Sequence, residues 1–102
     1  MIRHIVMLNL LSDYDPTELS AVMDGLARLG EVLPGFVGFE HGPNRDFEKK
    51  SVDYPYGFIC TFESADDVSV YANDPRHQAL GGRLVAMCNG GGAGIMVLDI
   101  DV

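Results

Sequence analysis

The sequence predicts an α+β fold in which helices cover one face of an antiparallel sheet. Four segments rich in apolar residues are typical of strands, at residues 2–11, 36–41, 56–62 and 95–101. Three further segments carry helix start signals, and two of them open with a proline. The chain has 102 residues, 47% of them hydrophobic and 22% charged. It is therefore long enough for one core and one domain, residues 1–102.

The first predicted strand is apolar on both faces. Its alternate positions form two sets, His4, Val6, Leu8 and Leu10 on one side and Ile5, Met7 and Asn9 on the other. A strand with water on one side would carry polar residues at every second position. Because so small a chain can cover only one sheet face with its own helices, we expect a second copy to cover the other. The sequence thus predicts a homodimer.

The first predicted helix begins after Asp15, which can cap the free amides, with Pro16 in the first position and Glu18 as the acid of a capping box. One apolar stripe then follows at spacings of three and four residues, made of Leu19, Val22, Met23, Leu26, Leu29 and Leu33. The helix ends at the Pro34-Gly35 pair.

The middle of the chain holds two strands and a loop. The second strand, residues 36–41, leads into residues 44–55, a polar segment without a periodic pattern that we expect to be a mobile loop. The third strand, residues 56–62, alternates Tyr56, Phe58, Cys60 and Phe62 on one face with smaller residues on the other.

Two short helices and a strand complete the chain. Ser64 is a good helix cap, with Asp66 and Asp67 at the positive end of the helix dipole, and Pro75 opens the next helix. A glycine-rich connection, residues 89–94, is expected to be flexible and precedes the last strand. The order strand, helix, strand, strand, helix pair, strand is the ferredoxin-like arrangement.

Charge and composition exclude several classes of partner. A net charge of −8 repels phosphate backbones and anionic lipid, so we expect no nucleic-acid or membrane partner. No apolar run reaches the ~20 residues that cross a bilayer. The N-terminal residues lack the features of a signal peptide, which predicts a cytoplasmic protein. Cys60 and Cys88 lack CxxC spacing and are expected to be buried thiols.

Three common kinds of site find no support in the motifs. The glycine run at residues 90–94 leads into a strand rather than a helix, so it is not a phosphate loop. His4, His41 and His77 are not paired at ligand spacing with another metal-binding residue, so no metal site is predicted. No serine or cysteine has the local sequence of a catalytic nucleophile.

The residues left for chemistry are His4, Tyr56, Tyr71 and His77. His4 shares strand parity with Val6 and is expected to face the helices that carry Tyr71 and His77. Imidazoles exchange protons near neutral pH, and a tyrosine hydroxyl can bind a carbonyl or enolate oxygen. The alternative is that the histidines are hydrogen-bonded core groups without a chemical role.

Several segments resemble the stress-responsive A/B barrel (Dabb) family over essentially the whole chain. The segments are residues 1–6 (MIRHIV), 33–35 (LPG), 39–42 (FEHG), 58–64 (FICTFES) and 71–77 (YANDPRH). The resemblance implies a ferredoxin-like protomer that dimerises through its sheet into an α+β barrel. Most members of the family have no assigned reaction.

One relative within the family, olivetolic acid cyclase of plants, closes a polyketide chain in a pocket between sheet and helices. Similarity to it implies that His4 and His77 match its acid/base pair and that Tyr71 matches a pocket tyrosine. Tyr56 and Leu26 stand where the cyclase has a further histidine and a further tyrosine, so its reaction does not transfer directly.

Two hypotheses about function follow. In the first, a homodimeric stress-response barrel binds a small, partly apolar molecule in a pocket between sheet and helices, near Tyr56, Leu26 and Phe58. In the second, the protein is a cyclase, lyase or isomerase that needs no cofactor. His4 and His77 would then share the acid and base roles, with Tyr71 orienting the substrate oxygen.

Overall fold

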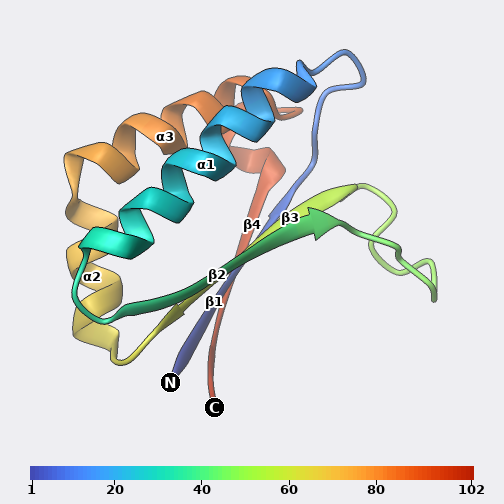
Figure 1. The fold of residues 1–102 in the computed structure, drawn as a ribbon. Coiled ribbons are helices and arrows are strands. Elements are labelled where there is room, and N and C mark those ends of the chain that lie inside the picture. Colours follow the sequence, from blue (N-terminus) through green and yellow to red (C-terminus); the bar gives the residue numbers. More distant parts are fainter.

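The computed structural model describes all residues, Met1–Val102, as an antiparallel sheet with helices on one face (Figure 1). The sheet order is β2-β3-β1-β4, so both edge strands pair with a central strand. The elements are β1 (Ile2–Leu8), α1 (Pro16–Val32), β2 (Phe36–Pro43), β3 (Tyr56–Phe62), α2 (Ala65–Asn73), α3 (Pro75–Ala86), the short 3-10 helix η1 (Gly91–Gly94) and β4 (Ile95–Asp101). The predicted ferredoxin-like α+β fold is confirmed.

The predicted helix starts are mostly correct, because capping is decided locally. The Asp15 side chain accepts from the Thr17 amide at 2.9 Å, and Ser64 caps α2 through the Asp67 amide at 3.3 Å. The capping-box role of Glu18 was wrong. Its carboxylate instead accepts two hydrogen bonds from the Arg83 guanidinium, at 2.6 and 2.8 Å, and so ties α1 to α3. A bidentate arginine is a stronger partner than the backbone amide of the cap.

Element ends that depend on distant contacts differ from the prediction. Strand β1 stops at Leu8 rather than at residue 11, because the Asn9 backbone bonds to the segment before β4: its amide to the Gly94 carbonyl and its carbonyl to the Asn89 amide, both at 2.8 Å. Leu10 keeps only an isolated bridge to Cys88. The expected flexible glycine segment contains a 3-10 turn, and β2 extends to Pro43.

The core fills the space between the sheet and the helices. It contains 16 buried residues, which come from β1, β2, β3, the three α-helices and the segments beside them, and includes Leu26 at 1% and Phe58 at 4% exposure. Cys60 and Cys88 are buried free thiols in this cluster, as predicted. No helix combines the length and apolarity needed to span a membrane.

The opposite sheet face, here called the open face, has no element of the chain over it (Figure 1). Its apolar side chains on β4 are exposed, with Met96 at 39%, Leu98 at 46% and Ile100 at 47%. The prediction that the chain's own helices cover only one face is thus confirmed.

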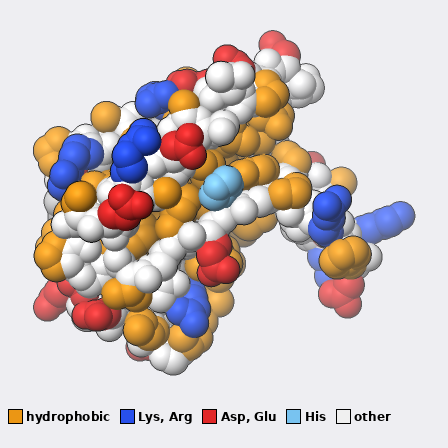
Figure 2. All heavy atoms as spheres, in the orientation of Figure 1, with side chains coloured by type: hydrophobic (Ala, Val, Ile, Leu, Met, Phe, Trp, Pro, Cys, Tyr) orange, Lys and Arg blue, Asp and Glu red, His pale blue; other side chains and the backbone are white.

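The loop between β2 and β3 projects from one end of the sheet and carries charges of both signs (Figures 1 and 2). Although its sequence shows no periodic pattern, the loop contains several side-chain hydrogen bonds. Asp46 Oδ1 accepts from the backbone amides of Lys50 and Ser51 and from the Ser51 hydroxyl, at 2.8–2.9 Å. Asn44 Nδ2 adds bonds to Ser51 and to the Tyr54 carbonyl. Polar side chains therefore give the loop a defined internal structure.

Candidate functional site

His4, Tyr71 and His77 meet on the helix-covered side of the sheet. They come from β1, α2 and α3, and the Tyr71 ring packs against both of the other two. Its centroid is 5.8 Å from that of His4 and 4.0 Å from that of His77. We call these three residues the His–Tyr–His cluster.

Local sequence explains how two helices bring Tyr71 and His77 together. Helix α2 ends at Asn73, and Asp74 serves at once as its C-cap and as the N-cap of α3. Its carboxylate accepts from the Arg76 amide at 2.8 Å, and Pro75 fills the first helical position. This sharp corner folds the first turn of α3 back towards α2, so the His77 ring lies against Tyr71.

His4 is held by a carboxylate that the sequence analysis did not single out. Asp99 lies opposite His4 in the β1–β4 ladder, and its Oδ1 accepts from His4 Nδ1 at 2.6 Å. The His4 side chain is only 14% exposed, whereas Asp99 is half exposed. Because Nδ1 carries the hydrogen, Nε2 of His4 is free to bind another group. The available signal was a pair of acidic residues, Asp99 and Asp101, at alternate positions of a strand whose other residues are apolar.

His77 has a similar arrangement with a backbone partner. Its Nδ1 lies 3.3 Å from the Ala72 carbonyl oxygen, which can only accept, so Nδ1 donates and Nε2 carries the lone pair. Burial lowers the pKa of His77, the Ala72 carbonyl opposes this in part, and the nearby His4 lowers the pKa further. His77 is therefore a neutral imidazole at pH 7.

Tyr71 is a buried, neutral phenol. It is 1% exposed and packs edge-on against Phe36, with ring centroids 5.3 Å apart. The Cys60 thiol donates a weak bond to its oxygen at 3.9 Å. Burial raises the pKa of Tyr71 above its usual range and that of Cys60 to about 12. The hydroxyl thus keeps its proton and remains a donor at neutral pH.

The three residues expected to bind substrate lie apart from this cluster. Leu26 and Phe58 pack in the core, at 1% and 4% exposure. Tyr56 is four residues from Cys60, the partner of His4 in the ladder, which places it about 13 Å along the strand. Its hydroxyl bonds instead to His41 Nδ1 at 2.6 Å, and burial raises its pKa.

The sequence matches the model of the Stress Responsive A/B Barrel Domain (Dabb) over residues 2–102. The chain belongs to the Dabb family. No curated protein matched the sequence.

Solved structures agree with this assignment. A dimeric ferredoxin-like protein of unknown function from Jannaschia sp. CCS1 shares 46% identity with a TM-score of 0.94, covering 99% of this chain and 98% of that one. A hydroxynitrile lyase from Passiflora edulis shares 16% identity with a TM-score of 0.82, over 99% and 92%. SnoaB, a cofactor-independent oxygenase from Streptomyces nogalater, shares 17% with a TM-score of 0.76, over 99% and 91%. At such low identity the last two establish only that the fold is shared.

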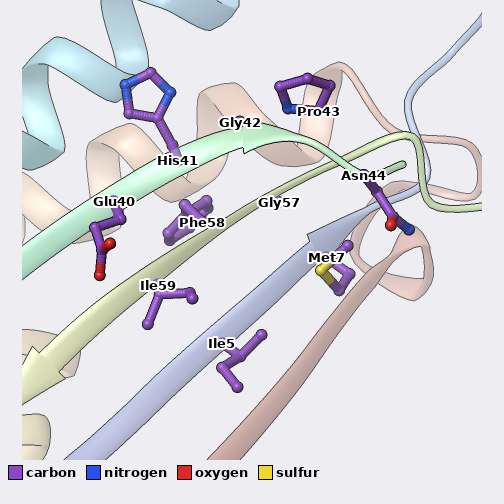
Figure 3. A pocket seen from close by; sticks show the side chains of 10 residues that line it. All are labelled: Ile5, Met7, Glu40, His41, Gly42, Pro43, Asn44, Gly57, Phe58 and Ile59. Carbon is purple, nitrogen blue, oxygen red and sulfur yellow. The ribbon is translucent and has the colours of Figure 1, made fainter. Parts of the chain in front are cut away.

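The Dabb domain also has a hollow of about 260 Å³ on its open face (Figure 3). This hollow was not predicted, although the two glycines that the structure aligns on neighbouring strands, Gly42 and Gly57, are visible in the sequence. It is lined by Ile5, Met7, Glu40, His41, Gly42, Pro43, Asn44, Gly57, Phe58 and Ile59.

Nowhere in the Dabb domain do three His, Cys, Asp or Glu side chains gather closely enough to hold a metal ion.

Proposed function

We propose that this Dabb domain acts in a stress response as a homodimer, with a second copy covering the open face. The exposed apolar side chains of β4 support the dimer, since each of them would be buried by such a partner. The Jannaschia neighbour, at 46% identity, is itself described as dimeric. The role in stress rests on the description of the family.

We further propose that the dimer binds a small, partly apolar molecule beside the His–Tyr–His cluster, between sheet and helices. The observation that carries this proposal is that both imidazoles use Nδ1 within the protein, at Asp99 and at Ala72, and keep Nε2 available. Aromatic rings around them favour an apolar or aromatic body. A lone pair on Nε2 favours a hydroxyl group on this body, and a carbonyl oxygen would bind only where Nε2 carries a proton.

The same geometry favours proton transfer as a second candidate function. A neutral His77 can accept a proton at Nε2 from a C–H or O–H group. His4, with Asp99 bound to its Nδ1, would give a different proton from its own Nε2 to the product, and the two imidazoles would regain their starting states by proton exchange with water. Tyr71, a phenol that keeps its proton, would orient a substrate oxygen. A cyclase, lyase or isomerase needs only these steps and no cofactor. The lyase and oxygenase named above have the same fold, which by itself does not assign a reaction.

Aryl methyl ketones are suitable probes for both candidates. Binding is measured by calorimetry, and proton transfer by NMR detection of α-hydrogen exchange in D₂O. We expect His77→Gln to weaken binding of these probes and to slow any exchange by about 10²-fold or more, the usual contribution of a general base to a rate. His41→Gln is the matched control, because its ring bonds to Tyr56 outside the cluster.

The outcomes separate the two candidates. Binding without exchange supports the binding protein alone. Equal binding and equal exchange in wild type, His77→Gln and His41→Gln would remove the His–Tyr–His cluster from the function altogether.

A further inference from the structure

Helices α1 and α3 lie side by side (Figure 1), and a cleft of about 260 Å³ lies between the second half of α1 and the start of α3. Its lining residues on α1 are Gly25, Arg28, Leu29 and Val32, at positions i, i+3, i+4 and i+7, so they share one face of that helix. Arg76 lines it from α3. The cleft is separate from the His–Tyr–His cluster, since no residue of the cluster lines it.

The floor of the cleft is apolar and reaches the surface. Leu80 of α3 packs directly on Gly25, where a Cβ atom would lie 2.8 Å from Leu80 Cδ2, so the two helices are in contact at this point. Further along α1, Leu29 is buried at 3% exposure, whereas Val32 is 59% exposed. A ligand could therefore enter from solvent and lie on these two side chains.

The two arginines of the cleft differ in what binds them. The Arg76 guanidinium donates to both carboxylate oxygens of Asp74, from Nε at 3.0 Å and from Nη2 at 2.7 Å, which leaves its Nη1 hydrogens unused. Arg28 forms no ion pair, although Asp24 and Glu31 stand about one turn away from it on α1. Two cationic groups thus line one cleft, and the one carboxylate bound there belongs to Arg76.

The other end of the same helix pair shows how an arginine between α1 and α3 is satisfied. There Arg83 of α3 donates to both carboxylate oxygens of Glu18 on α1, at 2.6 and 2.8 Å. Arg28 has no such partner on the facing helix, because the first turn of α3 contains no acidic residue. Guanidinium groups match the paired oxygens of carboxylates and phosphates. An anion from solution could supply these oxygens at the cleft.

We propose that this cleft binds a small organic anion, a carboxylate or a phosphate monoester, between Arg28 and Arg76. The apolar part of the ligand lies on Leu29 and Val32. The small volume excludes a large ligand, and the net charge of −8 repels a polyanion such as a nucleic acid. The site is additional to the proposed function and does not depend on the homodimer, because its residues lie on the helices and not on the open face.

Phenyl phosphate and benzoate are suitable probes, because they carry the same ring and different anionic groups. Each is titrated into the protein and followed by NMR of the backbone amides, at about 150 mM NaCl, where the Debye length of about 8 Å limits long-range repulsion. We expect saturable shifts centred on Gly25 and Arg28 with at least one probe, and the tighter probe identifies the ligand class. No saturable shift at these residues with either probe would overturn the proposal.

Variants test the role of the arginines. Arg28→Gln removes the unpaired guanidinium and leaves the Arg76–Asp74 pair intact, and Arg45→Gln is the matched control, because it loses the same charge on the exposed loop between β2 and β3. We expect the dissociation constant of the tighter probe to rise about tenfold or more in Arg28→Gln and in Arg76→Gln, and to change less than about twofold in Arg45→Gln. Circular dichroism checks that all three variants fold.

Two results would contradict the site. If Arg28→Gln and wild type bind the probe equally, the guanidinium does not hold the anion. If phenol, which lacks the anionic group, binds as tightly as phenyl phosphate, the apolar floor alone accounts for binding. Neither result bears on the His–Tyr–His cluster, whose test uses neutral ketones and His77→Gln.

Discussion

His77 connects the packing of one side chain to the pH dependence of the whole protein. Its pKa is lowered mainly by burial, so between that lowered value and the ordinary value near 6.5 the unfolded chain binds a proton that the folded chain does not. The resulting stability is fully present above pH 6.5 and is lost as the pH falls through the folded pKa.

We therefore predict that wild type loses more unfolding free energy between pH 7.5 and pH 5 than His77→Gln does. Urea denaturation at the two pH values measures the difference, and all other titrating groups are shared by both proteins. An equal loss in both would show that the His77 ring is protonated as easily in the folded as in the unfolded chain.

The neighbours of a side chain could be predicted where they depend on strand parity or helix position. They could not be predicted where they depend on how strands pair across the sheet. His4 was placed facing the helices because it alternates with Val6, and Tyr71 and His77 were placed on helices over it; the structure brings all three together. Asp99 was missed, because its contact with His4 depends on the register of β4 against β1. Whether these residues bind or react with a ligand stays a prediction.

At the scale of elements, two glycines should respond in opposite ways to the same substitution. Gly35 joins α1 to β2 with a φ of +81°, and a Cβ atom there would collide with the Asp67 carboxylate at the start of α2. Gly82 lies inside α3 with open space around it.

We predict that Gly35→Ala destabilises the protein by about 1–3 kcal/mol, and that Gly82→Ala stabilises it by about 0.5–1 kcal/mol. Chemical denaturation at one fixed protein concentration measures both, since dimer stability depends on concentration. A stabilised Gly35→Ala protein would show that this corner can relax away from Asp67.

The helices were predictable from local signals, and the ends of strands were not. Asp15, Ser64 and Pro75 mark helix starts within their own turns, which is why those boundaries agree. The end of β1 is set by Asn9, whose backbone partners are 80 and 85 residues away in the chain and leave no trace in the local pattern. Residues 44–55 form a loop, as predicted, but its internal hydrogen bonds were not predicted, because a single carboxylate, Asp46, makes several of them.

At the scale of the whole molecule, the two apolar faces of β1 indicated that the sheet needs a partner, and the exposed apolar side chains on β4 agree with that inference. The hollow on the open face was not predicted, because it depends on the alignment of Gly42 and Gly57 on neighbouring strands. A pattern along one strand can therefore predict that a face needs a partner. The fit between two copies requires the assembled sheet.

The net charge of the chain makes a prediction about how the proposed dimer responds to salt. Two chains of −8 each must approach one another, and the surfaces that meet on the open face are largely apolar. At about 10 mM salt the Debye length is about 30 Å, comparable with the size of the domain, whereas at 150 mM it is about 8 Å. Raising the salt therefore screens the repulsion without weakening the apolar contact.

We predict that the dissociation constant of the dimer falls several-fold between about 10 and 150 mM NaCl. Sedimentation at pH 7.5, where the carboxylates are ionised, measures it. Tighter association at low salt would require ion pairs across the interface and would contradict an interface made mainly by the apolar side chains of the open face.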